Sequence, residues 1–318
     1  MHPLTYEEIL DKIQNQRRFG NLPGVEVSGR MLESLGNPQT GMSVIHVAGT
    51  NGKGSVSAFL CSVLKEAGLR TGMFTSPHLV DFEERIQIDG RMITKEDVTR
   101  LGNLLLSEEY EVTPTMFDYC LGMAMLYFKE QNCDAVILET GLGGRLDSTN
   151  AVGTPVVSVI TKIGYDHVEI LGNTLGEIAA EKAGIIKKDT CLVTESQEQE
   201  ALQVILKAAK QAKSCQVVNP SEFTDMAYRK GGQEFSYHGY QKLRMKMLGS
   251  HQYENAAAAI LAAEAFFKEK GMNCSREIIR NGIANAGWQG RMEILSENPY
   301  FLVDGAHNGN GVKALAES

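Results

Sequence analysis

The sequence lacks the features of secreted, membrane-bound and nucleic-acid-binding proteins. Its 318 residues contain 31 Lys+Arg and 39 Asp+Glu, so a formal charge of −8 leaves no overall attraction for nucleic acid or anionic lipid. The longest apolar stretch, 256–267, is interrupted by Glu264 and is too short to span a bilayer. Acidic residues and helical periodicity within 1–13 argue against a secretory signal. We therefore expect a cytoplasmic protein, with neither a membrane nor a nucleic acid as its partner.

Cysteine is scarce, and its spacing excludes two further classes. No CxxC pair occurs among the six cysteines, which are Cys61, Cys120, Cys133, Cys191, Cys215 and Cys274. Spacing typical of metal sites or disulfides is thus absent, which indicates reduced thiols in a soluble protein. The chain also lacks a Ser/His/Asp or Cys/His nucleophile signature. Any phosphate must be bound by a local binding site, because the negative net charge of the chain does not attract it.

What the sequence contains is an alternation of short apolar runs and helical patterns. A capping box at 5–8 predicts a first helix to about Phe19, and a second helix is expected over 29–35. Buried strands are predicted at 43–48, 71–75, 135–138, 155–160 and 191–194. Helices are predicted at 53–67, 114–130, 174–182 and 198–212. This alternation predicts an α/β fold of the P-loop NTPase type, with a mostly parallel sheet flanked by helices.

The pattern changes after Cys215. Polar and apolar positions alternate over 225–248, which predicts a small antiparallel sheet, and helices are expected at 253–269 and 275–284. A buried strand is predicted at 300–304, followed by a Gly-containing turn and a helix start. We expect two domains: 1–296 as an ATP-binding central domain, and 297–318 as the beginning of a truncated, Rossmann-like second α/β domain.

The sharpest local signal is a Gly-rich loop between the strand at 43–48 and the helix at 53–67. It offers glycine amides, a helix N-terminus and the charge of Lys53 to a phosphate. It departs from the general Walker pattern, with Val47 at the first Gly position and Gly54 before the Ser. An ordinary strand–helix turn is the alternative interpretation. The expected nucleotide-binding residues are Gly49, Thr50, Asn51, Gly52, Lys53, Gly54 and Ser55.

With this departure, the Gly-rich loop resembles that of the Mur ligase superfamily, and specifically that of the folylpolyglutamate synthase/dihydrofolate synthase family. Further segments are similar to that family in the same order along the chain. They are Thr-Ser-Pro-His-Leu at 75–79 with Phe-Glu-Glu-Arg-Ile at 82–86, the acidic Gly-rich segment 139–150, Asp-His at 166–167 with 171–185, His-Gln-Tyr-Glu-Asn-Ala at 251–256, Gly-Arg-Met-Glu at 290–293 and Asp-Gly-Ala-His-Asn at 304–308. Together these motifs extend over most of the chain.

The resemblance implies two Mg²⁺ sites. It assigns Ser76 and Glu139 to the first ion and His167 to the second, with Lys182 carbamylated beside it. Taken alone, Glu139 ends a predicted strand at the ligand-binding edge of a parallel sheet, where a carboxylate suits Mg²⁺. A solvated strand-end Glu is an equally good interpretation of that position. Taken alone, His167 is more typical of a structural histidine, and Lys182 of a solvated helix face.

The resemblance also assigns residues to the organic substrates and the nucleotide. The expected substrate-binding residues are Thr115, Gly144, Arg145 and Asp147. Nucleotide contacts are expected from Asn255 for adenine, Arg291 for the polyphosphate, Asp304 for the ribose and His307. On spacing alone, Arg145 and Asp147 could equally form an ion pair within their loop. Asp118 stands where this family more often has Glu, a departure in the folate pocket.

The implied activity is ATP-dependent amide ligation. ATP would phosphorylate a folate or dihydropteroate carboxylate, and L-glutamate would displace phosphate from the acyl phosphate, in a chain expected to be monomeric. Lys53, Glu139, His167 and Lys182 would carry the phosphoryl transfer. Three alternatives remain: a Mur ligase acting on a nucleotide-sugar peptide, a nucleotide-binding module without ligase activity, and a nucleic-acid-dependent ATPase. The charge of −8 disfavours the last of these.

Overall fold

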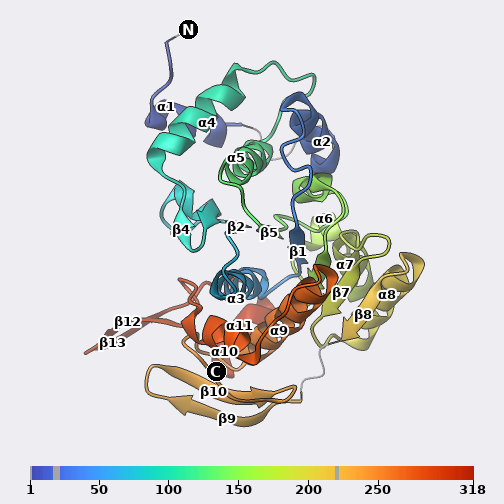
Figure 1. Ribbon diagram of the computed structural model, residues 1–318, viewed down its shortest axis with the longest axis vertical. Coiled ribbons are helices and arrows are strands. Elements are labelled where there is room, and N and C mark those ends of the chain that lie inside the picture. Colours follow the sequence, from blue (N-terminus) through green and yellow to red (C-terminus); the bar gives the residue numbers. More distant parts are fainter. Residues whose placement is uncertain (1, 17–21, 219–221) are drawn as a thin grey trace.

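The fold is built on one eight-stranded sheet that lies between two layers of helices in the computed structural model (Figure 1). The structure describes residues 2–16, 22–218 and 222–318. The strand order is β4-β3-β2-β5-β1-β6-β7-β8, parallel from β2 to β8, with β3 and β4 antiparallel at one edge. The strands are β1 (Val44–Ala48), β2 (Thr71–Phe74), β3 (Ile86–Ile88), β4 (Arg91–Met92), β5 (Ala135–Glu139), β6 (Val157–Ile160), β7 (Cys191–Thr194) and β8 (Cys215–Val218). The predicted parallel α/β sheet is confirmed.

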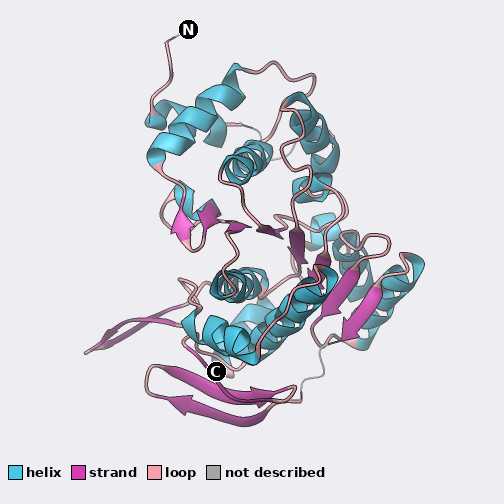
Figure 2. Ribbon diagram, in the orientation of Figure 1, coloured by secondary structure: helices cyan, strands magenta, loops and turns pink. Residues whose placement is uncertain are grey.

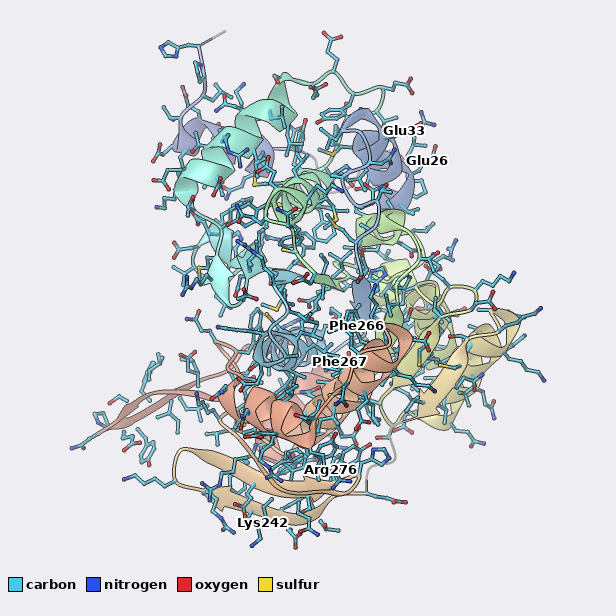
Figure 3. The ribbon with its side chains drawn as sticks, viewed as in Figure 1. Glu26, Glu33, Lys242, Phe266, Phe267 and Arg276 are labelled. Atoms are coloured by element: carbon cyan, nitrogen blue, oxygen red, sulfur yellow. The ribbon has the colours of Figure 1, made fainter. Side chains whose placement is uncertain are left out.

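Helices cover both faces because successive strand residues point to opposite sides. Val47 of β1 packs into the cluster formed with α3 (Lys53–Glu66), α9 (His251–Glu269) and α10 (Arg276–Asn285). Figure 3 shows Phe266 and Phe267 of α9 in this layer. Val44 packs on the opposite face. That face is covered by α1 (Tyr6–Gln14), α2 (Gly24–Ser34), α4 (Lys95–Ser107) and α5 (Met116–Glu130), and farther along by α7 (Leu175–Ala183) and α8 (Gln199–Gln211).

Two small sheets complete the fold (Figure 2). The predicted antiparallel sheet is formed by β9 (Thr224–Arg229), β10 (Gly232–Tyr237) and β11 (Tyr240–Met245), and its apolar face packs on α9. The second is a hairpin of β12 (Glu293–Glu297) and β13 (Tyr300–Val303), followed by α11 (Gly309–Ala316). None of the described helices has the length and apolarity needed to cross a membrane.

Two helix boundaries and one burial expected from the sequence are wrong. The first helix ends at Gln14 rather than near Phe19, since Asn15 caps it and donates its side-chain amide back to Asp11; residues 17–19 lie outside the described part. The second begins at Gly24, directly after the extended Pro23. The strand at 300–303 is exposed rather than buried, because β12 is its only sheet partner among the described residues.

Candidate active site

The phosphate loop, residues 49–55, lies between the carboxyl end of the central strand β1 and the start of α3. The segment after β6 holds its backbone: the amides of Thr50 and Asn51 donate to the Lys162 carbonyl at 2.9 and 3.2 Å. The Thr50 hydroxyl both donates to the Gly164 carbonyl and accepts from its amide, each at 3.0 Å. The loop is therefore fixed before any ligand binds, with the positive end of the α3 dipole beside it.

Two glycines of the loop are required by its geometry. Gly52 has a φ of 89°, in the left-handed region that favours glycine, and a Cβ there would collide with the Asn255 side chain from α9. A Cβ on Gly54 would lie 2.6 Å from the indole Nε1 of Trp288. The loop thus has Asn255 against one part and Trp288 against another. Asn255, the expected adenine contact, is buried and donates to Gln252 Oε1 at 2.9 Å.

Residues from three separate motifs meet around Lys53. Its Nζ lies 3.9 Å from Glu139 Oε1 and donates to the carbonyls of Gly49 and Thr50 at 3.2 and 3.4 Å. Glu139 ends β5 and is 5% exposed, and its Oε2 accepts the Ser76 amide at 3.3 Å. Burial raises the pKa of Glu139, and the positive charge of Lys53 acts against that rise. A cation bound beside Glu139 would further favour its ionised form.

Lys182 is a buried lysine of α7, not the solvated residue that its helix pattern suggests. It is 4% exposed, and its Nζ donates to the Gly49 carbonyl at 2.8 Å. Burial, aided by the nearby charge of Lys53, lowers the pKa of Lys182 to about 7. Part of the population therefore carries a neutral, nucleophilic amine near neutral pH.

The Asp166–His167 segment reaches the same loop by another route. His167 adopts a left-handed backbone at the start of α6 (Val168–Leu171), and its imidazole is about half exposed. Asn308, before α11, and Asn51 of the phosphate loop exchange side-chain hydrogen bonds at 3.1 and 3.2 Å. Asn308 also donates to Asp166 Oδ2 at 3.5 Å. This asparagine pair links the C-terminal segment to the phosphate loop.

The expected substrate residues lie in the loop 141–150 and at the start of α5. Asp147 is buried and accepts hydrogen bonds from within its own loop, whereas Arg145 forms an ion pair with Glu181 at 2.7 Å. Gly144 packs closely against the backbone carbonyls of α7. Thr115 caps α5 in a capping box with the buried Asp118. The structure thus places these four residues as loop and helix anchors.

The residues of the C-terminal segment that were expected to contact the nucleotide form hydrogen bonds within that segment. Asp304 accepts the amides of Met292 and Ala306 at 2.9 and 2.8 Å. Arg291 donates to the Gly290 carbonyl at 3.1 Å, and a ring nitrogen of His307 lies 2.8 Å from the Gly305 carbonyl.

One cleft joins these parts. It has a volume of about 1260 Å³ and is lined by both the sheet edge and the C-terminal segment, including Gly54, Ser76, Glu139, Trp288, Arg291 and His307. Across residues 2–16, 22–218 and 222–318, no three His, Cys, Asp or Glu side chains group as a metal cage. A single buried carboxylate beside a phosphate loop suits Mg²⁺, which usually takes one or two protein ligands together with phosphate oxygens and water.

Sequence reasoning gave no role to several residues at or near this site. Trp288 reaches the loop from a distant segment, and Asn308, the last residue of the motif at 304–308, was given no role but bonds to Asn51. His46 is buried in the middle of an apolar strand. Glu195, after β7, is a buried carboxyl group whose Oε1 has no hydrogen-bond partner among the described residues. Burial, with the charge of Glu254, raises the pKa of Glu195 to about 8. Only a histidine within a β-branched run could have pointed to His46.

Comparison with known proteins gives consistent matches along the chain. The Mur ligase middle domain family matches residues 47–263. A Bacillus subtilis dihydrofolate synthase/folylpolyglutamate synthase is 43% identical over 99% of this chain and 76% of its own length. A Lacticaseibacillus casei folylpolyglutamate synthase is 34% identical over 90% of this chain and 69% of its own.

Solved structures agree with these sequence matches. An FPGS complex with AMPPCP and folate superposes with a TM-score of 0.92 at 32% identity, over 98% of this chain and 79% of that one. The Mycobacterium tuberculosis folylpolyglutamate synthase complexed with ADP gives a TM-score of 0.89 at 31% identity, over 98% and 72%.

Proposed function

Because the chain belongs to the folylpolyglutamate synthase/dihydrofolate synthase family of Mur-type ligases, we propose that it joins L-glutamate to the carboxylate of a folate or dihydropteroate. ATP-dependent glutamate ligation to folates is the reaction of this family. The observation that carries the proposal for this chain is the convergence of Lys53, Glu139 and Lys182 on one phosphate loop at the cleft.

The proposed reaction begins with phosphoryl transfer. The γ-phosphoryl group of ATP moves to the acceptor carboxylate and gives an acyl phosphate, while Lys53 balances the charge on the transferring oxygens. The amino group of glutamate then attacks the acyl carbon, and the tetrahedral intermediate collapses to an amide as phosphate leaves. Trp288 packs against the phosphate loop at one side of the cleft, where it would shield the acyl phosphate from part of the solvent.

Mg²⁺ would be held by Glu139 and Ser76 at one position and by His167 at a second. When bound, it would supply charge neutralisation between phosphate oxygens. Glu139 suits this role because it is a buried carboxylate at the sheet edge, next to the cation of the loop. His167 is half exposed and can turn toward a ligand without breaking a core contact.

We also propose that Lys182 is carbamylated. A neutral amine adds to CO₂, which forms an N–C bond and releases one proton, and the lowered pKa of Lys182 makes this amine available near pH 7. The product would replace a buried cation with anionic oxygens beside the second metal position. Enzyme equilibrated with ¹³C-bicarbonate should show a carbamate resonance that is missing in Lys182→Gln.

The remaining parts of the proposal concern partners and compartment. Charge −8 without a basic stripe supports small molecules rather than nucleic acid as partners. The six free cysteines suit a reducing cytoplasm. We propose a monomer, which sedimentation would test.

The deciding experiment measures ADP formation from Mg-ATP with dihydropteroate or a reduced folate, each with and without L-glutamate. Glutamate-dependent ADP release with a glutamylated product in the mass spectrum is the expected result, and the preferred acceptor identifies the activity. ATP binding with no glutamate-dependent turnover for either acceptor would instead indicate a nucleotide-binding module.

A further inference from the structure

A chain of hydrogen bonds runs from the core of the sheet to the loop 141–150. His46, in the middle of β1, is 2% exposed, and its Nε2 lies 2.8 Å from Thr149 Oγ1. The Thr149 hydroxyl in turn lies 2.5 Å from Asp147 Oδ1. All three side chains are buried, so water does not compete for these bonds.

The surroundings of Asp147 fix the direction of this chain. Its carboxylate accepts the backbone amides of Leu142 and Thr149 at 2.8 and 3.0 Å, which favours the ionised form although burial raises its pKa. Asp147 Oδ1 accepts both the amide and the hydroxyl of Thr149, so the single hydroxyl proton of Thr149 points to Asp147. The remaining partner of Thr149 must then be a donor, which places the proton of the imidazole on Nε2 of His46. Burial lowers the pKa of His46 to about 3, so the ring is neutral.

Two site loops are therefore tied to one strand. β1 ends at Ala48 and continues into the phosphate loop, while His46, two residues earlier, faces the loop that carries Asp147. Asp147 draws the two ends of this loop together, since it accepts Leu142 from one side and Thr149 from the other. Its negative charge also acts on Lys182, whose pKa it raises against the effect of burial.

We propose that His46, acting through Thr149, is a positioning residue of the ligase that holds the loop 141–150 and the Asp147 carboxylate in register with the phosphate loop. This inference rests on the proposed function, because the loop would carry the acceptor. His46 touches no substrate in this proposal. A histidine serves here because its rigid ring delivers one N–H donor from the strand backbone to the loop.

The test combines kinetics with a spectroscopic measurement. His46→Leu and Thr149→Val remove the chain, while His46→Gln and Thr149→Ser each keep a polar group in place. We expect the first pair to lower kcat/KM for the folate acceptor about tenfold to a hundredfold with KM for ATP within about twofold, and the second pair to recover most of the loss. The double variant His46→Leu/Thr149→Val should lose no more than either single variant, since both break one chain.

The ¹⁵N NMR spectrum of His46 in the unmodified protein should show a neutral, Nε2-protonated ring. An Nδ1-protonated ring would overturn the proposal, as would normal acceptor kinetics in folded His46→Leu and Thr149→Val. If the unmodified chain shows no glutamate-dependent turnover, the proposed function fails. In that case the NMR spectrum still tests the hydrogen bond between His46 and Thr149. A change in the His46 Nε2–H signal in Thr149→Val, where this bond is missing, would support the proposed bonding.

Discussion

The two walls of the cleft are built in different ways. The sheet-side wall includes Gly54 and Glu139, and behind it the side chains of Lys53 and Lys182 meet the phosphate loop at one buried edge. The C-terminal wall includes Arg291 and His307. It is held by hydrogen bonds within 290–306, such as that from the Met292 amide to Asp304, and lies beside an exposed hairpin (Figure 2).

This difference indicates where the site is rigid. A buried edge supported by five parallel pairings holds its charges in place without a ligand, which is what phosphoryl transfer requires. The C-terminal wall is connected to the phosphate loop by a few hydrogen bonds, among them the Asn51–Asn308 pair, rather than by a buried core. We expect chemistry to depend on the first wall and nucleotide affinity on the second.

The largest expected effect is that of Lys53→Ala. Loss of this cation should lower turnover by about a thousandfold or more, because a charge-assisted contact to the transferring phosphoryl group is removed. Steady-state ADP release measures the effect, and circular dichroism checks the fold. Lys210→Ala, at the exposed end of α8 and outside the lining of the cleft, is the control and should remain active. Near-normal turnover in Lys53→Ala would contradict the phosphate-loop assignment.

The free energy of unfolding should depend more on the buried sheet than on the exposed C-terminal hairpin. Phe128 is fully buried on α5 against β2, and Phe128→Ala should lower the free energy of unfolding by about 3–5 kcal/mol. Phe301, on the exposed hairpin, is the control, and Phe301→Ala should change it by less than about 0.5 kcal/mol. Urea unfolding followed by fluorescence measures both. Equal losses would mean that the hairpin contributes as much to the fold as the core does.

The pH dependence of stability should depend on the buried Glu195. Its folded pKa of about 8 exceeds its usual 4.5, so between these values the folded state binds more protons than the unfolded state. Stability therefore falls as pH rises through this window, by up to about 1.4 kcal/mol per pH unit. Glu195→Gln should be more stable than the unmodified chain at pH 8 by a few kcal/mol, and the difference should vanish near pH 4.5.

Urea unfolding at pH 5 and pH 8 measures this effect, with the exposed Glu198→Gln as the control. If the free energy of unfolding of Glu195→Gln still falls with pH as in the unmodified chain, another buried group controls this pH dependence.

The strands of the sheet-side wall were largely predictable from their own residues, whereas the residues of the C-terminal wall, Arg291 and His307, were expected only from the family resemblance. Continuous apolar runs such as 135–138 fix buried parallel strands, and a carboxylate directly after such a run must lie at the sheet edge, as Glu139 does. The helix α4 (Lys95–Ser107) was not predicted, although the sequence has a usable signal for it, a cap at Thr94 followed by apolar residues at helical spacing.

The burial of single side chains could not be read from the sequence. Lys182 has the local pattern of an exposed residue, and only the packing of α7 against the phosphate loop buries its amine. The apolar strand 300–303 has the pattern of a buried strand but is exposed, because burial depends on which elements cover it. The local sequence does not show which elements will pack against Lys182 or the strand 300–303. Nor does it show the contact between Asn51 and Asn308, which are 257 positions apart.

The smallest predicted effect tests the link between the two walls. Asn308 accepts the Gly311 amide as the cap of α11 and pairs with Asn51, so Asn308→Ala removes both a helix cap and the link. Asn308→Ser retains a capping hydroxyl but is too short to maintain the amide pair. If the link orders the C-terminal wall, both variants should raise KM for ATP several-fold, about 1 kcal/mol, and leave kcat nearly unchanged. Titration with Mg-ATP under steady-state conditions measures the change. A normal KM in Asn308→Ser with a raised KM in Asn308→Ala would assign the effect to the helix cap, and the two walls would then be connected by other contacts.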